Sequence, residues 1–319
     1  MTLDLFIRLL QSALWNVPLS LETPVDEETW YDVYDMSRHQ TVEGLLYDVI
    51  CGLSSDAGLP RDLAATWLLA ADRIERNYRR IAAEVERQTR VWQDNGIDAV
   101  LMKGTAVAAM YPVPEHRVIG DIDWWIRGDD DWNRALELLR RNGIRAGQDS
   151  DGDVHYQSNG IVVEHHRGGM FADGPVGVLM MLNEHILHHA AVTGIGMRHL
   201  CDLAMAYRHY SGSYDAAEYI SLLGSMRMLR WTALLHAVLR QVLGTPEDIL
   251  PELSGAMRVR RRDCDRFLQL VMTDGNFGLN RKWRYAGLWR RFTLLLRYVP
   301  GPLVRRWTGL LGGRIRRFV

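Results

Sequence analysis

The pattern of hydrophobic and polar positions predicts a long helix followed by the start of a small sheet. Across residues 61–93, apolar side chains recur with a period close to 3.6 and charged residues fill the positions between them. This pattern predicts a helix of about thirty residues that ends at Asn95-Gly96, a typical helix stop. The run IDAVLM at residues 97–102 then predicts a strand, and residues 106–110 predict a short helix.

Further along, the pattern predicts a second amphipathic helix and a hairpin. Apolar residues at helical spacing predict a helix over residues 131–142, with Gly143 as its stop. Strands are predicted at 154–157 and 161–165, on either side of Ser158-Asn159-Gly160. Because Asn-Gly favours the tight turn that joins two antiparallel strands, these strands are predicted to form a hairpin.

Helical patterns also flank this stretch, at residues 26–50 and again from residue 178 to residue 242. We therefore predict an α/β fold of the α+β type, with a small mixed β-sheet core between helical regions. The predicted regions are an N-terminal helical region, a core and a C-terminal helical region, at 1–95, 96–175 and 176–319.

Composition is that of a soluble globular protein. Of the 319 residues, 47% are hydrophobic and 24% are charged. No apolar run is long enough for a membrane span, and the N-terminus carries Asp4 without a basic segment, so no signal peptide is expected. The three cysteines are widely separated and offer no disulfide framework. A reducing, cytoplasmic location fits these features best.

Charge is concentrated at the C-terminal end. Residues 281–319 hold eleven Lys or Arg and no acid, whereas the preceding 280 residues carry a net charge of −12. Tryptophan and leucine residues lie among these cations. Such a basic tail fits an anionic membrane surface, nucleic acid, or the acidic body of the same protein. Docking onto the body is at least as well supported as either outside partner.

Two carboxylates dominate the candidate chemistry. Asp121 and Asp123 are two residues apart, so on a strand both side chains leave the same face, while Ile122 and the following WWI run cover the other. Two carboxylates at that spacing favour a bound cation, for which Mg²⁺ is the natural choice. The alternative is a solvated strand end, since this short motif is common.

A third carboxylate is predicted on the second hairpin strand. Val162, Glu164 and His166 share one face of that strand, opposite Ile161, Val163 and His165. Glu164 is therefore a candidate third ligand in a site for two Mg²⁺ or Mn²⁺ ions, or a general base. An ordinary surface glutamate is the alternative.

Phosphate-binding candidates precede the carboxylates. Gly104 would let backbone amides approach a phosphate, and Thr105 opens the predicted short helix. Lys103 and Arg117 are cationic candidates for the same phosphates. Ordinary surface charge is the alternative for both.

These blocks resemble the catalytic core of the polymerase-β-type nucleotidyltransferase superfamily, and more narrowly its bacterial family usually labelled uncharacterised nucleotidyltransferase. The family pattern is matched in order by Lys103-Gly104, Arg117, Asp121-x-Asp123, Glu164-His165-His166, His189 and the run at 194–205 with Arg198 and Asp202. The resemblance covers residues 97–207. It departs from many superfamily members at Thr105, where serine is usual, and in the longer gap before Asp121.

The resemblance implies a metal-dependent nucleotidyltransferase that moves a nucleoside monophosphate from a triphosphate such as ATP to a hydroxyl acceptor, releasing pyrophosphate. The acceptor is left open among small molecules, saccharides and proteins, and no base-specific fingerprint is recognisable. Nucleic acid is not favoured as acceptor, because the body is acidic. A non-catalytic nucleotide-binding or regulatory module on the same fold is the alternative.

Two further groups lie in the predicted C-terminal helices. His185, His188 and His189 have metal-ligand spacing on a helix, but no cysteine cluster accompanies them, so we favour histidines that line or support the cleft over a zinc site. Arg198 and Asp202 are four apart and can pair. Arg198 is predicted to hold the triphosphate or acceptor, and His166, His189 and Asp202 are predicted to support the site. A structural ion pair is the alternative.

Overall fold

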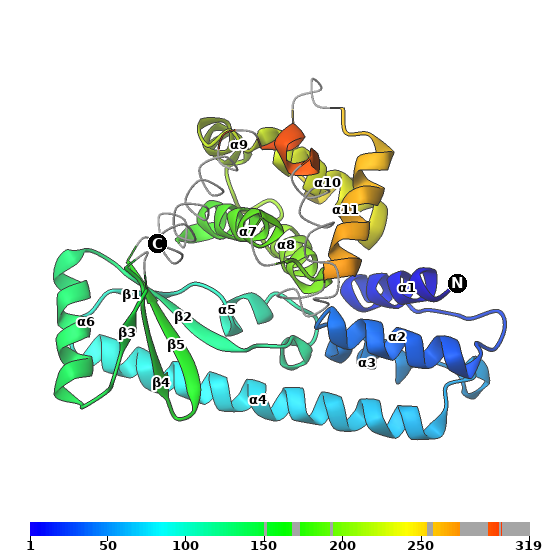
Figure 1. Ribbon diagram of the computed structural model, residues 1–319, viewed down its shortest axis with the longest axis horizontal. Helices are drawn as coiled ribbons and strands as arrows, with labels where there is room; N and C mark the ends of the chain where they lie inside the picture. Colours follow the sequence, from blue (N-terminus) through cyan, green and yellow to red (C-terminus); the bar gives the residue numbers. More distant parts are fainter. Residues whose placement is uncertain are drawn as a thin grey trace, which may run out of the picture. The chain divides into compact units, whose positions relative to one another are not determined.

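The computed structural model of the chain contains two compact units (Figure 1). One comprises Met1–Tyr34 with Val42–Val178, and the other Asp35–Thr41 with Leu179–Val319. The structure describes residues 1–149, 152–167, 173–191, 194–253, 258–274, 293–299 and 301. The division into regions at 1–95, 96–175 and 176–319 that the sequence predicts is a separate description of the chain and remains a prediction.

A five-stranded mixed sheet forms the centre of the first unit, which confirms the predicted fold class. The strand order is β1-β2-β5-β4-β3, in which β2 and β5 are parallel and the other neighbours are antiparallel. The strands are β1 Ala99–Leu101, β2 Asp121–Ile126, β3 Gly147–Gln148, β4 Val154–Ser158 and β5 Ile161–His166. The short edge strand β3 was not predicted, since two residues leave no recognisable period.

The predicted hairpin is β4–β5. Asn159 and Gly160 have φ angles of 51° and 72°, the left-handed conformations that a two-residue hairpin turn requires. Each strand is one residue longer than predicted, because Ser158 pairs with Ile161 across the turn and His166 pairs with Trp125 of β2. This register places the side chains of the hairpin on fixed faces of the sheet.

The helices of the first unit agree with the predicted pattern in most places. They are α1 Thr2–Trp15, α2 Glu27–His39 (whose last residues belong to the second unit), α3 Glu43–Ile50, α4 Arg61–Asp94, α5 Thr105–Ala108 and α6 Asp129–Arg141, with 3-10 turns at Ser55–Ala57 and Pro114–His116. α4 confirms the predicted long helix to within one residue. α5 begins one residue earlier than predicted and ends two residues earlier. α1 lies in the predicted N-terminal helical region, but its bounds were not predicted.

α4 and α6 pack against one face of the sheet (Figure 1). Trp92 of α4 and Trp132 of α6 lie in one buried cluster with Ile122, Trp124 and Val163 of the central strands. Because side chains alternate along a strand, this packing directs the residues between these apolar ones to the opposite face. That opposite face carries the predicted acidic residues.

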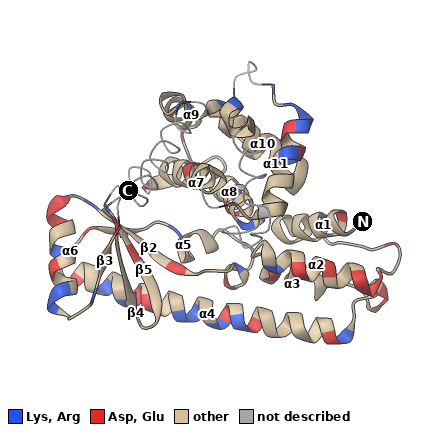
Figure 2. Cartoon of the chain, viewed as in Figure 1, with Lys and Arg blue, Asp and Glu red and all other residues tan. Residues whose placement is uncertain are grey.

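The outer surface of α4 is strongly charged. Figure 2 shows basic and acidic residues interspersed along its length. Arg76 pairs with Asp72 at 2.6 Å and Arg79 with Glu75 at 2.8 Å, both one helical turn apart. The alternation of apolar and charged positions that predicted the helix thus separates its buried stripe from its solvent-facing side.

Helices also form the second unit. They are α7 Gly174–Ala191 (whose first residues belong to the first unit), α8 Met197–Tyr210, α9 Ala216–Ser225, α10 Leu229–Leu243 and α11 Arg261–Asp274, with a 3-10 turn at Glu247–Ile249. Large buried side chains, including Tyr207, Trp231 and Phe267, fill its core. α10 ends at Gly244 in a left-handed conformation, as the predicted chain break requires.

Most of the basic segment 281–319 lies outside the described residues. In the described stretch 293–299, Arg297 lies 3.4 Å from the buried carboxylate of Asp263 on α11, and the Tyr298 hydroxyl donates to the same carboxylate at 2.8 Å. This part of the segment therefore packs on its own unit, while contact with a membrane or nucleic acid stays a prediction. Within the described part of the chain, no helix has the length and apolar character that a bilayer crossing needs.

Candidate functional site

The predicted carboxylates lie on the two parallel strands at the centre of the sheet. Asp123 of β2 is directly beside Glu164 of β5 in the strand register. Only 2% of Asp123 is exposed, whereas Glu164 and Asp121 are partly buried. Asp121 lies two residues earlier on the same face of β2, as predicted.

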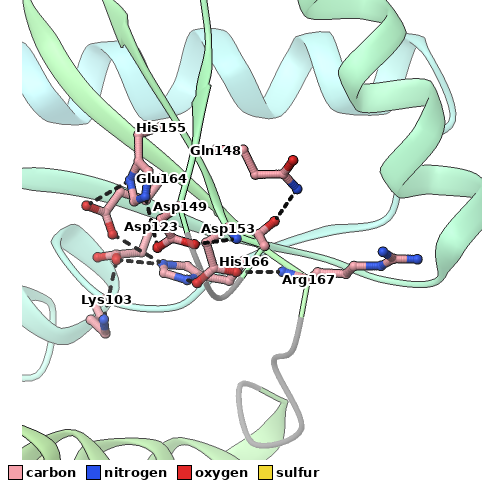
Figure 3. Close-up of polar contacts among 10 residues, drawn as sticks. Lys103, Asp123, Gln148, Asp149, Asp153, His155, Glu164, His166 and Arg167 are labelled. Atoms are coloured by element: carbon pink, nitrogen blue, oxygen red, sulfur yellow. Dashed lines mark hydrogen bonds and ion pairs between the residues drawn. The ribbon is translucent and has the colours of Figure 1, made fainter. Parts of the chain in front are cut away.

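Two basic side chains surround Asp123 (Figure 3). Lys103 Nζ lies 3.3 Å from Asp123 Oδ1, and His166 Nε2 lies 3.0 Å from the same oxygen. Burial alone raises the pKa of Asp123, but the Lys103 ammonium and the His166 ring outweigh burial and lower it to about 2. The carboxylate is therefore ionised at physiological pH.

His166 is held in turn by a carboxylate behind it. Its Nδ1 lies 2.7 Å from Asp153 Oδ2, and the Arg167 backbone N–H donates to the other oxygen of Asp153 at 3.2 Å. Burial opposes protonation of His166, yet the carboxylates of Asp123 and Asp153 outweigh it and raise the pKa of the ring. A protonated ring can donate to both carboxylates at once.

A second histidine stands in the same relation to Glu164. His155 of β4 has Nδ1 3.4 Å from Glu164 Oε1 and Nε2 3.2 Å from Asp149 Oδ2. Two parallel chains of acid, imidazole and acid therefore converge on the site (Figure 3). Sequence reasoning missed Asp149, Asp153 and His155. The hairpin register could have revealed His155, since it places this residue opposite Glu164.

The glycine turn places Lys103 beside these carboxylates. Gly104 has φ 61°, and a Cβ at this position would lie 3.3 Å from the carbonyl oxygen of Asp121. Arg117 is only 4% exposed, and its Nη1 donates to the carbonyl oxygens of Gly104 and Val118 at 3.4 Å. Arg117 thus stabilises the backbone of the turn through these hydrogen bonds. Thr105 is the first residue of α5.

The side chains that converge fit a divalent cation. Asp123, Glu164 and His166 each offer a donor atom, and these atoms lie within 4.8 Å of one another. Carboxylate oxygens suit Mg²⁺ and Mn²⁺. Lys103 and His166 already lie against Asp123 Oδ1 and offset its charge, so a cation that binds this oxygen would take the place of these contacts.

The remaining predicted residues belong to the second unit. His189 on α7 and Asp202 on α8 are buried, and Arg198 lies in the first turn of α8. The Arg198 backbone N–H donates to the Gln40 carbonyl within the same unit at 3.4 Å. A role for these three side chains in nucleotide binding stays a prediction.

The chain is similar to a known protein family over part of its length and to a solved structure. A crystal structure of tRNA nucleotidyltransferase complexed with a primer tRNA and an incoming ATP analog is 12% identical, covering 69% of this chain and 86% of that chain. Its TM-score of 0.22 is too low to carry an inference. No curated protein matches significantly. Residues 26–175, however, match the model of the family described as uncharacterised nucleotidyltransferase.

Proposed function

We propose that this protein is a metal-dependent nucleotidyltransferase that moves a nucleoside monophosphate from a nucleoside triphosphate to a hydroxyl acceptor and releases pyrophosphate. The observation that carries the proposal is the buried, ionised Asp123 beside Glu164, with Lys103 and His166 against it. The match of residues 26–175 to the uncharacterised nucleotidyltransferase family supports nucleotidyl transfer as the general chemistry.

The three carboxylates are assigned to cation binding. Asp121, Asp123 and Glu164 would hold one or two Mg²⁺ or Mn²⁺ ions, which would offset the charge of the triphosphate and of the transition state. Because the pKa of Asp123 is about 2, this ligand needs no deprotonation at working pH. The buried position of Asp123 also limits competing hydration.

The phosphate-binding role falls to the turn before β2. Lys103 is within reach of the metal ligand Asp123, so its ammonium can pass from that carboxylate to the triphosphate when nucleotide binds. The backbone of Gly104 and Thr105 would also contact the triphosphate, and Arg117 stabilises this turn by donating to the Gly104 carbonyl. Arg198 is proposed to bind the triphosphate, with His189 and Asp202 supporting it.

The transfer step forms one bond and breaks another. The acceptor oxygen attacks the α-phosphorus, and the bond from this phosphorus to the oxygen that bridges to the β-phosphate breaks, so pyrophosphate leaves with that oxygen. The acceptor proton passes to Glu164, which His155 and Asp149 orient from behind. The chain contributes mainly positioning and electrostatic stabilisation.

An assay of label transfer tests this function. The protein is incubated with Mg²⁺ and each α-³²P-labelled nucleoside triphosphate, with and without lysate of the source cells as a supply of acceptors. We expect labelled product that disappears in Asp123→Asn and persists in Asp130→Asn, an exposed acid on α6. Loss of the buried carboxylate is expected to slow transfer by roughly 10²-fold or more.

Each outcome has a defined meaning. Normal transfer by folded Asp123→Asn would overturn the proposed site. Tight Mg²⁺-dependent nucleotide binding with no transfer from any labelled triphosphate would instead favour a non-catalytic nucleotide-binding module. The labelled product itself would identify the acceptor class.

A further inference from the structure

A cluster of imidazole rings lies in the second unit, on residues of that unit alone. His185 and His189 are one turn apart near the end of α7, and His199 lies in the first turn of α8. The ring centroid of His189 is 4.3 Å from that of His185 and 4.9 Å from that of His199. One donor nitrogen from each ring lies within 4.8 Å of the others.

Burial makes this arrangement informative. His199 is 2% exposed and His189 is also buried, whereas His185 is partly exposed. Burial lowers the pKa of His199 well below its usual value, with the nearby Arg198 acting in the same direction, and Asp202 opposes the shift. The ring is therefore neutral, which is the form that binds metals.

We propose that His185, His189 and His199 bind one zinc-class transition-metal ion through three imidazole nitrogens. Two histidines four residues apart on a helix plus a third from another element form a common three-ligand zinc arrangement. Imidazole selects zinc, cobalt, nickel or copper over magnesium, so this site differs in chemistry from the carboxylate group. The sequence alone showed only the α7 histidines, and His199 supplies the missing ligand.

The ion would join the end of α7 to the start of α8. His199 lies directly after Arg198 and three residues before Asp202, so the ion would fix the helical turn that carries both. Zinc–nitrogen bonds of about 2.0–2.1 Å bring tetrahedral donors to within about 3.4 Å of each other. Metal binding should therefore bring the three donor nitrogens closer together than they are now. At the His199 ring, the charge of Asp202 acts against that of Arg198.

Metal content of the full chain tests the site. The protein is loaded with Zn²⁺, dialysed against metal-free buffer and measured by plasma mass spectrometry, and Co²⁺ replaces Zn²⁺ for visible spectroscopy. We expect about one bound ion per chain, with the absorption of tetrahedral cobalt. His185→Asn and His189→Asn should each retain less than about a tenth of this metal.

Two matched controls make the result specific. His188→Asn changes a histidine of the same helix that lies outside the three-ring group, and it should keep its metal. The double variant Asp123→Asn, His166→Asn removes ligands of the carboxylate group and should also keep it. Because these readouts do not involve transfer, failure of the proposed activity leaves this test unaffected.

The results that would overturn the site are equally distinct. They are substoichiometric zinc in the wild type, equal loss of zinc in His188→Asn, or retention of zinc in folded His185→Asn. Loss of zinc only in the double variant would place the ion at the carboxylate group instead. His185 is the first position to change because its partial exposure makes misfolding of the variant least of a concern.

Discussion

At the scale of single residues, the candidate site depends on how Asp123 is neutralised. Its oxygen Oδ1 has Lys103 at 3.3 Å and His166 at 3.0 Å. The sequence predicted Lys103 as a phosphate ligand and His166 as a supporting residue, and the structure brings both to one carboxylate oxygen. Two side chains with defined partners thus set the charge of the site before any ligand binds.

Asp153 is the residue whose role is easiest to isolate, because it contacts His166 and not the other predicted ligands. We expect Asp153→Asn to leave the fold intact and to reduce transfer roughly 10–100-fold, the usual range for a residue that orients a site histidine. Rates are compared at saturating nucleotide. Asp130→Asn serves as control, and wild-type rates in Asp153→Asn would contradict an orienting role.

Gly104 gives a second test at residue scale. Gly104→Ala combines the strain of a positive φ with a close approach to the Asp121 carbonyl, and we expect it to lower the free energy of unfolding by about 1–3 kcal/mol and to weaken nucleotide binding. Urea unfolding and nucleotide titration measure the two effects.

The matched control is Gly143→Ala. Gly143 has a similar φ of 66°, but a Cβ there would meet nothing within 4 Å. It should show the strain alone, with unchanged nucleotide binding. Equal binding defects in both variants would show that the contact at Gly104 is unimportant for the site.

At the scale of elements, a buried glutamate links α4 to the β4–β5 turn. Glu84 is 4% exposed and accepts hydrogen bonds from Arg87 at 2.6 Å, Gln88 at 2.7 Å and Asn159 at 2.7 Å. Burial raises the pKa of Glu84, but these hydrogen bonds together with one from Ser158 lower it to about 2. The position of the hairpin on the long helix is thus coupled to the charge of one carboxylate.

This coupling predicts a pH dependence of stability. Because the folded-state pKa lies below the reference value of 4.5, the contribution of Glu84 is complete above that pH and is lost as the pH falls toward 2. We expect Glu84→Gln to cost about 2 kcal/mol at pH 7 and progressively less below pH 4.5. Urea unfolding of both proteins across this range measures the difference.

A more exposed acid provides the comparison. The Glu137 side chain on α6 is 38% exposed and pairs with Arg140 and Arg141 at 2.8 Å, and ion pairs at the surface contribute little. Glu137→Gln should change stability far less than Glu84→Gln and lose even that effect in high salt. A constant difference for Glu84→Gln at all pH values would contradict the coupling.

At the scale of the whole molecule, the chain contributes a short early segment to its late unit. Asp35–Thr41 belongs with Leu179–Val319. Gln40 is 1% exposed, accepts from the Met197 backbone N–H at 2.7 Å and donates to the Val271 carbonyl at 3.2 Å. The Gln40 side chain therefore hydrogen-bonds both a backbone N–H at the start of α8 and a backbone carbonyl of α11.

Removing that side chain tests the organisation. Gln40→Ala leaves a buried donor and a buried acceptor unsatisfied, so we expect a loss of about 1–3 kcal/mol in the stability of the second unit. Hydrogen exchange should show faster exchange in α8 and α11 and unchanged exchange in β2 and β5. Gln241→Ala, which removes an exposed contact to Asp265, is the control. Uniformly faster exchange would contradict two separate units.

The sequence by itself determined the features that depend on local periodicity. The 3.6-residue period fixed α4, and the alternation in residues 161–166 predicted that Glu164 and His166 share a face opposite buried Val163. Asn159-Gly160 fixed the hairpin because only certain residues tolerate a positive φ. These features follow from backbone geometry over a few residues, so no distant partner is needed to predict them.

Only the tertiary structure decided which distant segments meet. The pairing of β2 with β5, the burial of Asp123 and the approach of Lys103 and His166 to it all join residues separated by long stretches of chain. The same holds for His199 beside the α7 histidines. No local pattern encodes such contacts, because they result from packing two sides of a sheet or two helices together. That packing converts separate polar residues into sites with defined charge and ligand chemistry.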